Sequence, residues 1–186
     1  MNEEIYNLIN SSIRNNRKIF IAIEGPCASG KTTLSEKIAE SFDCNIIHID
    51  DFFLPFDKRT PERMAEVGGN FDYDRFADEV IANLQSGKPF TYGKFDCSKG
   101  KVTDKIEITP KTVTVIEGVY SMHPHFDDIY DFRIFIEINE EMQLNRLKKR
   151  SHDKLDRFIN EWIPRENAYF EKYDIKNKCD IVIESL

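Results

Sequence analysis

Gly25-Pro26-Cys27-Ala28-Ser29-Gly30-Lys31-Thr32 is the stretch that decides the fold of this chain. The apolar run Ile19-Phe20-Ile21-Ala22-Ile23 precedes it, and Leu34 and Ile38 follow it at helical spacing. The order is therefore strand, glycine-rich turn and helix, with the G-x-x-x-x-G-K-T spacing of a phosphate-binding P-loop. A chance glycine turn is the alternative, but the whole pattern matches in its expected strand-to-helix setting, which favours the P-loop.

Each part of the motif has a physical reason. Gly25 and Gly30 can adopt backbone angles that are closed to residues with a Cβ, so successive N–H groups can turn inward around an anion. The helix that begins near Lys31 adds its positive end, Lys31 would reach the β- and γ-phosphates, and the Thr32 hydroxyl would bind Mg²⁺. The candidate nucleotide-binding residues in this stretch are Gly25, Ala28, Ser29, Gly30, Lys31, Thr32 and Thr33.

Bulk composition limits the class of protein. The 186 residues predict one domain, and 40% hydrophobic with 32% charged residues is typical of a soluble globular chain. The net charge of −7 argues against general nucleic-acid binding. No apolar run approaches membrane-span length, the start Met1-Asn2-Glu3-Glu4 lacks the features of a secretion signal, and the widely spaced cysteines fit a reducing cytosol. We therefore expect a cytoplasmic protein that binds neither nucleic acid nor membrane.

Alternating strands and helices predict an α/β fold, a P-loop three-layer sandwich with a five-stranded parallel sheet and helices on both faces. The expected strands are 19–23, 45–49, 113–116, 132–136 and 180–183. The expected helices are an N-terminal one within 1–16, then 75–85, 140–150 and 158–173, the last kinked or split at Pro164. A long loop is expected at 56–74, and a small β-hairpin flap at 89–109.

Acidic residues follow two of these strands. Asp50-Asp51 comes after the second strand and Glu117 after the third core strand, at the sheet edge where ligands bind in open α/β sheets. A solvated turn is the alternative for the double acid. Mg²⁺ prefers carboxylate and phosphate oxygens, and a second carboxylate can accept the proton of an attacking hydroxyl. The pattern predicts Mg²⁺-assisted phosphoryl transfer, with Asp50 and Lys31 as catalytic residues.

The phosphoryl acceptor is expected to be a small organic molecule. The excursions at 56–74 and 89–109 are rich in aromatic and acidic residues, which suit a small-molecule pocket. Asp72 and Tyr92 are the better functional candidates there, whereas Phe52, Phe76 and Phe90 are expected in the core.

Among the basic residues after 145, Lys148 and Lys149 are expected on a solvated face. Arg150 and Arg157 bracket a polar stretch, about 150–160, that could close as a lid.

At this point the chain resembles the uridine kinase family of P-loop nucleoside kinases, over residues 18–184. The resemblance rests on Gly25 to Thr32, Asp50-Asp51-Phe52-Phe53-Leu54-Pro55, Asn70-Phe71-Asp72 and Val115-Ile116-Glu117-Gly118. The P-loop alone indicates only the large superfamily of P-loop proteins. Asp50-Asp51-Phe52-Phe53-Leu54-Pro55 and the strand end Glu117-Gly118 narrow the resemblance to the branch that contains uridine kinase, pantothenate kinase and phosphoribulokinase.

The resemblance implies a role for each matching residue. Asp50 matches the general base for a 5′-hydroxyl, and Thr32, Asp50 and Glu117 match positions around Mg²⁺. Asp72 matches an acid that holds ribose hydroxyls, and Tyr92 an aromatic residue at the base pocket. Arg150 is expected to assist catalysis and Arg157 to bind the nucleotide as a lid arginine. The full set expected to contact the acceptor is Asp51, Phe53, Asp72 and Tyr92.

The expected activity is transfer of the γ-phosphoryl group of ATP, or of another nucleoside triphosphate, to the 5′-hydroxyl of a nucleoside such as uridine or cytidine. One departure from the family bears on the acceptor: Phe95-Asp96-Cys97 occupies the stretch where the family has a base-reading histidine. A kinase of another primary alcohol, pantothenate-like or a sugar, is therefore an alternative. A nucleotide-binding regulator is the second alternative. The flap at 89–109 is a candidate interface for a homo-oligomer.

Overall fold

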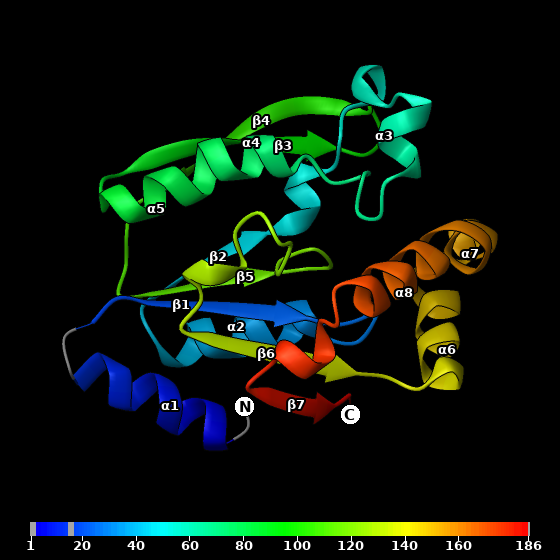
Figure 1. The fold of residues 1–186 in the computed structure, drawn as a ribbon. Helices are drawn as coiled ribbons and strands as arrows, with labels where there is room; N and C mark the ends of the chain where they lie inside the picture. Colours follow the sequence, from blue (N-terminus) through cyan, green and yellow to red (C-terminus); the bar gives the residue numbers. More distant parts are fainter. Residues whose placement is uncertain (1–2, 15–16, 186) are drawn as a thin grey trace.

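A computed structural model describes residues 3–14 and 17–185 (Figure 1). Its central sheet has five parallel strands in the order β2-β5-β1-β6-β7. The strands are β1 (Ile19–Glu24), β2 (Cys44–His48), β5 (Val113–Glu117), β6 (Phe132–Glu137) and β7 (Ile181–Glu184). All five carboxyl ends therefore lie along one edge of the sheet, on the right in Figure 1. The predicted five-stranded parallel sheet is confirmed.

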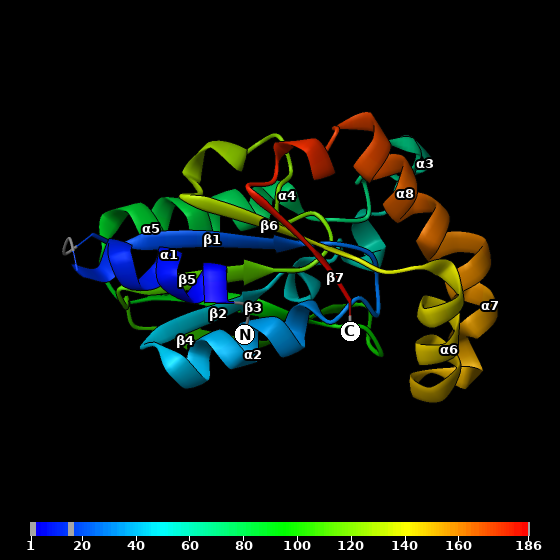
Figure 2. The same ribbon diagram turned by 90° about the horizontal axis from the view of Figure 1, so that it is seen from below.

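Helices cover both faces of this sheet (Figures 1 and 2). On one face α1 (Glu3–Arg14) and α2 (Lys31–Ser41) bury Ile9 and Ile38 in one apolar cluster. On the other face a continuous helical segment buries Phe76 and Leu84 in a second cluster. That segment consists of α4 (Tyr73–Phe76), a π-turn (Ala77–Ile81) and α5 (Ala82–Ser86). The two clusters make the predicted three-layer sandwich. The helix predicted at the N-terminus is seen as α1, and positions 1, 2, 15 and 16 lie outside the described residues.

The predicted hairpin is also present. β3 (Phe90–Asp96) pairs antiparallel with β4 (Lys101–Ile108) as a separate two-stranded sheet. The hairpin packs against the π-turn Ala77–Ile81 and against a 3₁₀ turn, Ile49–Phe52, that follows β2. Phe52, Phe76 and Phe90 are buried, as expected for core residues.

The segment 56–74 is more ordered than predicted. It contains the helix α3 (Pro61–Ala65), and the next helix begins at Tyr73 rather than at residue 75. Both starts have caps: Thr60 Oγ1 accepts from the Arg63 N–H at 3.2 Å, and Asp72 Oδ1 accepts from the Arg75 N–H at 3.3 Å. A side-chain oxygen at the N-cap satisfies a backbone donor that the helix itself cannot pair, so these short helices can form here.

The C-terminal part carries α6 (Glu140–Arg150), α7 (Leu155–Arg157) and α8 (Ile163–Lys172). Pro164 lies in the first turn of α8, directly after a π-turn over Phe158–Trp162. Proline has no N–H to continue the regular pattern, which explains the interruption that the sequence predicts. The segment expected to act as a lid is folded as short helical turns beside α6 and α8 (Figure 2).

Within residues 3–14 and 17–185, no helix has both the length and the apolar character needed to cross a membrane.

Candidate functional site

The P-loop connects β1 to α2 at the carboxyl edge of the sheet. Gly25 and Gly30 have φ values of 139° and 103°, in the region that favours glycine. A Cβ at Gly25 would also lie 2.4 Å from the carbonyl oxygen of Ile136, so a side chain cannot be accommodated there. Ser29 Oγ is buried and has no hydrogen-bond partner among the described residues. A tight loop at a helix N-terminus with an unpaired buried hydroxyl fits the phosphates of a nucleotide.

Residues far along the chain hold this loop in place. Gln143 Nε2 donates to the Cys27 carbonyl at 3.0 Å, and Arg146 Nη1 donates to the Ala28 carbonyl at 3.0 Å. The Glu166 carboxylate accepts from the Cys27 N–H at 2.8 Å. Helices α6 and α8 therefore brace the P-loop from outside. The sequence does not predict these contacts, because nothing in its local pattern pairs residue 27 with residues 143 and 166.

The Lys31 ammonium lies on the loop itself. Nζ donates to the carbonyls of Gly25 at 2.6 Å and Pro26 at 2.9 Å, and the residue is 9% exposed. The next residues, Thr32 and Thr33, are exposed in the first turn of α2. The positive charge is thus held within the loop that is expected to receive the phosphates.

Glu117 joins the P-loop to the acids that follow β2. Thr32 Oγ1 donates to Glu117 Oε1 at 3.0 Å, and His48 Nδ1 lies 2.6 Å from the same oxygen. This hydrogen bond to Glu117 is the main cause that raises the pKa of His48 above its ordinary value. The structure therefore brings together the ends of β2 and β5 and the start of α2, as the sequence predicts. His48 was not predicted as part of the site.

Asp50 extends into solvent from the 3₁₀ turn after β2. Desolvation of its carboxyl by the surrounding protein raises its pKa most, the nearby Glu117 charge raises it further, and Lys31 and His48 lower it. Asp50 is thus within electrostatic range of both the P-loop lysine and Glu117. A raised pKa makes this carboxylate a stronger base than an ordinary aspartate.

Three side chains at the carboxyl edge of the sheet carry oxygen atoms that suit a hard cation as ligands. They are Thr32 Oγ1 and the carboxylates of Glu117 and Asp50, the predicted magnesium residues. Within the described residues, no group of three or more His, Cys, Asp or Glu side chains forms a complete metal cage. Mg²⁺ is commonly held by one or two carboxylates plus phosphate oxygens and water, so this donor set fits it.

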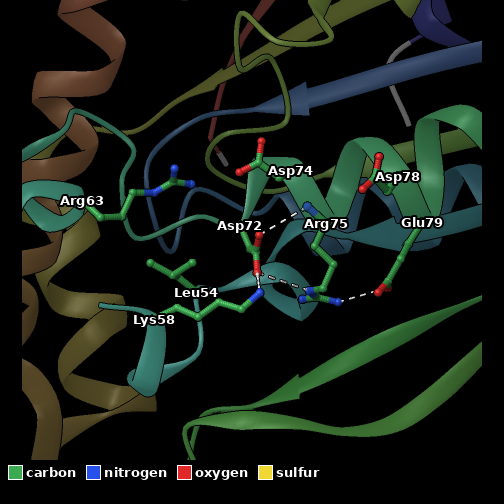
Figure 3. A pocket seen from close by; sticks show the side chains of 8 residues that line it. All are labelled: Leu54, Lys58, Arg63, Asp72, Asp74, Arg75, Asp78 and Glu79. Atoms are coloured by element: carbon green, nitrogen blue, oxygen red, sulfur yellow. Dashed lines mark hydrogen bonds and ion pairs between the residues drawn. The ribbon is translucent and has the colours of Figure 1, made fainter. Parts of the chain in front are cut away.

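Asp72 lies in a hollow of about 510 Å³ beside α4 (Figure 3). Oδ2 is 3.4 Å from Lys58 Nζ and 3.8 Å from Arg75 Nε, and the residue is 3% exposed. The hollow is lined by Leu54, Lys58, Arg63, Asp72, Asp74, Arg75, Asp78 and Glu79. Its lining is almost entirely charged, whereas the sequence predicts an aromatic pocket.

The other residues predicted to contact the acceptor take different positions. Tyr92 is 2% exposed, and its hydroxyl donates to Asp51 Oδ2 at 3.1 Å. Burial, followed by the Asp51 charge, raises the pKa of this hydroxyl. Phe53 is half-buried, bridges to the Phe71 backbone and has its ring 6.2 Å from that of Phe95. Asp51 and Tyr92 thus contact each other.

The predicted lid arginines are both exposed. Arg150 is exposed at the end of α6. Arg157 is exposed, ion-paired with Glu161 at 3.3 Å, with its guanidinium 4.8 Å from the centre of the Trp162 ring. Arg146 is the arginine of α6 that contacts the P-loop directly. A lid role for Arg150 and Arg157 therefore stays a prediction.

Glu24 is a buried acid that the sequence analysis did not select. It ends β1, is 0% exposed, and accepts from the Met122 N–H and the Tyr169 hydroxyl at 3.0 Å each. Burial raises its pKa from 4.5 to about 7, against the effect of those hydrogen bonds and of Lys31. The carboxyl is therefore largely protonated in the folded protein at pH values where the unfolded chain is ionised.

This shift predicts a pH-dependent stability. The folded state holds the Glu24 proton between pH 4.5 and 7, so its stabilising contribution is lost as pH rises through this window. We expect the stability of the wild type relative to Glu24→Gln to fall by about 2 kcal/mol from pH 5.5 to 8.5, since one pKa unit equals about 1.36 kcal/mol. Urea unfolding at several pH values measures the difference. A gap that stays constant with pH would contradict the assignment.

Comparisons with known proteins show the family to which this chain belongs. A model of the phosphoribulokinase/uridine kinase family matches residues 20–185. Uridine kinase from Clostridium perfringens is 24% identical over 185 residues, covering 90% of this chain and 87% of that protein. Uridine-cytidine kinase A from Dictyostelium discoideum is 25% identical over 179 residues, covering 89% of this chain and 36% of that protein.

Two solved structures share the fold. A possible uridine kinase from Bacillus stearothermophilus gives a TM-score of 0.71 at 17% identity, covering 97% of this chain and 99% of that one. D-glycerate 3-kinase from Cryptococcus neoformans gives a TM-score of 0.61 at 12% identity, covering 88% of this chain and 86% of that one. The P-loop three-layer architecture predicted from the sequence is confirmed by these similarities.

Proposed function

Because the chain belongs to the phosphoribulokinase/uridine kinase family and is a phosphotransferase, we propose that it transfers the γ-phosphoryl group of ATP to the 5′-hydroxyl of a nucleoside, uridine or cytidine first. The observation that supports this most strongly is the meeting of Lys31, Thr32, Glu117 and Asp50 at one edge of the sheet. The relatives named uridine kinase and uridine-cytidine kinase support the choice of nucleoside.

In the proposed reaction, the acceptor hydroxyl donates its proton to Asp50 while its oxygen bonds to the γ-phosphorus. The bond from that phosphorus to the bridging oxygen breaks, and ADP leaves. The P-loop N–H groups and Lys31 neutralise charge that builds up on the phosphate oxygens. Thr32, Glu117 and Asp50 would hold Mg²⁺, which supplies further charge neutralisation when bound. Asp72 orients the sugar by accepting from its hydroxyls.

A polar alcohol without a nucleobase is the second candidate acceptor. The hollow beside Asp72 is lined by charged residues and Leu54, and Tyr92 is buried with its hydroxyl on Asp51. A pyrimidine ring would find no aromatic side chain in that hollow, whereas a sugar or pantothenate-like alcohol needs none. The position of Cys97, where the family has a histidine, favours the same alternative.

Acceptor-dependent ATP use tests the proposal. We expect at least about tenfold stimulation of ADP release by uridine or cytidine, with the phosphate recovered on the 5′-hydroxyl. Stimulation only by a sugar or a pantothenate-like alcohol would replace the nucleoside with the second candidate. Equal turnover with and without every alcohol in the panel would instead favour a nucleotide-binding regulator and contradict the kinase.

Replacing Asp72 tests the acceptor side of the site. Asn is also a good N-cap residue, so Asp72→Asn should keep the start of α4 while removing the charge. We expect the KM for the acceptor to rise about 10- to 100-fold, the value of one hydrogen bond to a charged group. The KM for ATP should stay within about twofold. A rise in the KM for ATP with an unchanged acceptor KM would place Asp72 on the nucleotide side.

A further inference from the structure

One ion pair holds both the backbone N–H and the backbone carbonyl of Gly93 in the hairpin. Arg75 and Glu79 lie one turn apart on the helical segment 73–86, with Arg75 Nη1 3.3 Å from Glu79 Oε2 (Figure 3). Arg75 Nη1 donates to the Gly93 carbonyl at 2.6 Å, and Glu79 Oε2 accepts from the Gly93 N–H at 2.8 Å. The Arg75–Glu79 pair therefore holds the two consecutive peptide groups that meet at Gly93.

The same guanidinium also holds the turn that carries Asp50. Arg75 Nη2 donates to the Asp51 carbonyl at 2.7 Å, and the guanidinium lies 4.3 Å from the centre of the Phe52 ring. The Arg75 side chain is 10% exposed. This one arginine thus joins three segments: the helical segment 73–86, the strand β3 and the turn Ile49–Phe52.

The side chains of the two neighbours of Gly93 also connect the hairpin to the turn Ile49–Phe52. The Tyr92 hydroxyl donates to Asp51 Oδ2 at 3.1 Å, and Lys94 Nζ lies 3.9 Å from Asp51 Oδ1. The Asp51 carboxylate therefore faces the hairpin and is 6% exposed, whereas its neighbour Asp50 is exposed at the crevice. The hairpin thus engages the Asp51 carboxylate through Tyr92 and Lys94.

Arg75 also lies beside the acid expected to hold the acceptor. Its Nε is 3.8 Å from Asp72 Oδ2, too far for a hydrogen bond, and this Nε has no partner among the described residues. Its backbone N–H is capped by Asp72 Oδ1. The three acids on the acceptor side, Asp50, Asp51 and Asp72, are thus each linked to Arg75 directly or through one peptide bond.

We infer that Arg75, supported by Glu79, is a positioning residue that sets the distance between the Asp50 base and the Asp72 site by fixing the hairpin against the turn Ile49–Phe52. This inference rests on the proposed kinase function. A planar guanidinium can bond Gly93 and Asp51 in two directions at once, whereas a lysine ammonium lacks that fixed fork. Misplacement of reacting groups by about 1 Å can cost about 100-fold in rate, so the geometry of this one side chain controls turnover.

Arg75→Lys tests the inference, because it keeps the charge and removes the fork. We expect kcat to fall about 10- to 100-fold and the acceptor KM to rise, with the KM for ATP within about twofold. Arg17→Lys is the matched control, since Arg17 makes a surface ion pair with Asp131 at 2.7 Å and is 73% exposed. The control should match the wild type. Wild-type kcat and acceptor KM in Arg75→Lys would overturn the inference.

Glu79→Ala gives a second test if the first variant does not fold. Glu79 is a third exposed, so its removal should leave the core intact while freeing the Gly93 N–H. We expect faster hydrogen–deuterium exchange in β3 and a raised acceptor KM, with exchange in β1 unchanged. The exchange measurement needs no substrate, so it reports on the contacts of Arg75 and Glu79 with Gly93 even if no acceptor is found. An inactive wild type would count against the proposed function, whereas an active Glu79→Ala with unchanged exchange and acceptor KM would count against the inference alone.

Discussion

Asp50→Asn is expected to lower kcat by about 10²- to 10⁴-fold, the usual cost of losing a positioned general base. The KM for ATP should change little. Asn has the shape of Asp but cannot accept the proton of the acceptor hydroxyl. Because Asp50 is exposed and follows the last residue of β2 by only two positions, the substitution should leave the sheet unaltered.

The electrostatics around Asp50 explain why this acid is suited to the role. Desolvation of its carboxyl and the Glu117 charge raise its pKa, and Lys31 and His48 lower it. Asp51, the neighbouring acid, is instead buried against Tyr92 and the hairpin, where it cannot reach a substrate hydroxyl without breaking that contact. The geometry thus favours Asp50 over Asp51 as the base.

A control at the other end of β2 separates chemistry from folding. Asp43 precedes β2 at the opposite edge of the sheet, where it makes a surface ion pair with Lys111 at 3.0 Å. Asp43→Asn should retain wild-type kcat, since exposed ion pairs contribute little. Steady-state kinetics on both variants, with thermal melts, give the comparison. Near-normal turnover in Asp50→Asn would remove this residue from the proposed role.

The sheet and its ligand-binding edge follow from local sequence. The apolar runs at 19–23, 45–49, 113–116, 132–136 and 180–183 each became a strand, because a parallel sheet covered on both faces needs strands that are apolar throughout. The carboxyl ends of such strands meet at one edge, so the proximity of Thr32, Glu117 and His48 follows from topology alone. The roles assigned to the site residues stay predictions.

Local signals also existed for one element that was missed. Thr60-Pro61-Glu62-Arg63 carries an N-cap residue followed by proline at the first helical position, which is typical of a helix start. The polar composition of the segment nevertheless favours a loop. The short helix α3 follows from that cap rather than from an apolar face, since none of its residues is buried.

Other features were beyond the reach of any local pattern. The bracing of Cys27 by Gln143 and Glu166 joins residues more than a hundred positions apart. The burial of Tyr92 depends on where the hairpin docks, and a tyrosine in an alternating strand is equally compatible with a substrate pocket or a core contact. Tertiary packing decides such cases, and the sequence alone holds no periodic signal for it.

Lys31→Ala is expected to lower kcat/KM for ATP by about 10²- to 10³-fold, as removal of a transition-state charge stabiliser typically does. The loop would lose its positive charge and also the donor that bonds the Gly25 and Pro26 carbonyls. Lys37→Ala on the same helix is the matched control, because Lys37 is exposed and away from the loop. That variant should match the wild type, and a Lys31→Ala variant within tenfold of it would contradict the proposed phosphate role.

The same variant also tests whether Asp50 is the base. The Lys31 charge lowers the pKa of Asp50, so its removal should raise that pKa. Asp50 would then be protonated at higher pH, and the acidic limb of the kcat profile should move to higher pH in Lys31→Ala. The position of this limb does not depend on the absolute rate, so it can be measured in a slow enzyme. A slow variant with an unmoved acidic limb would keep Lys31 as a phosphate ligand but would show that the titrating base is a group other than Asp50.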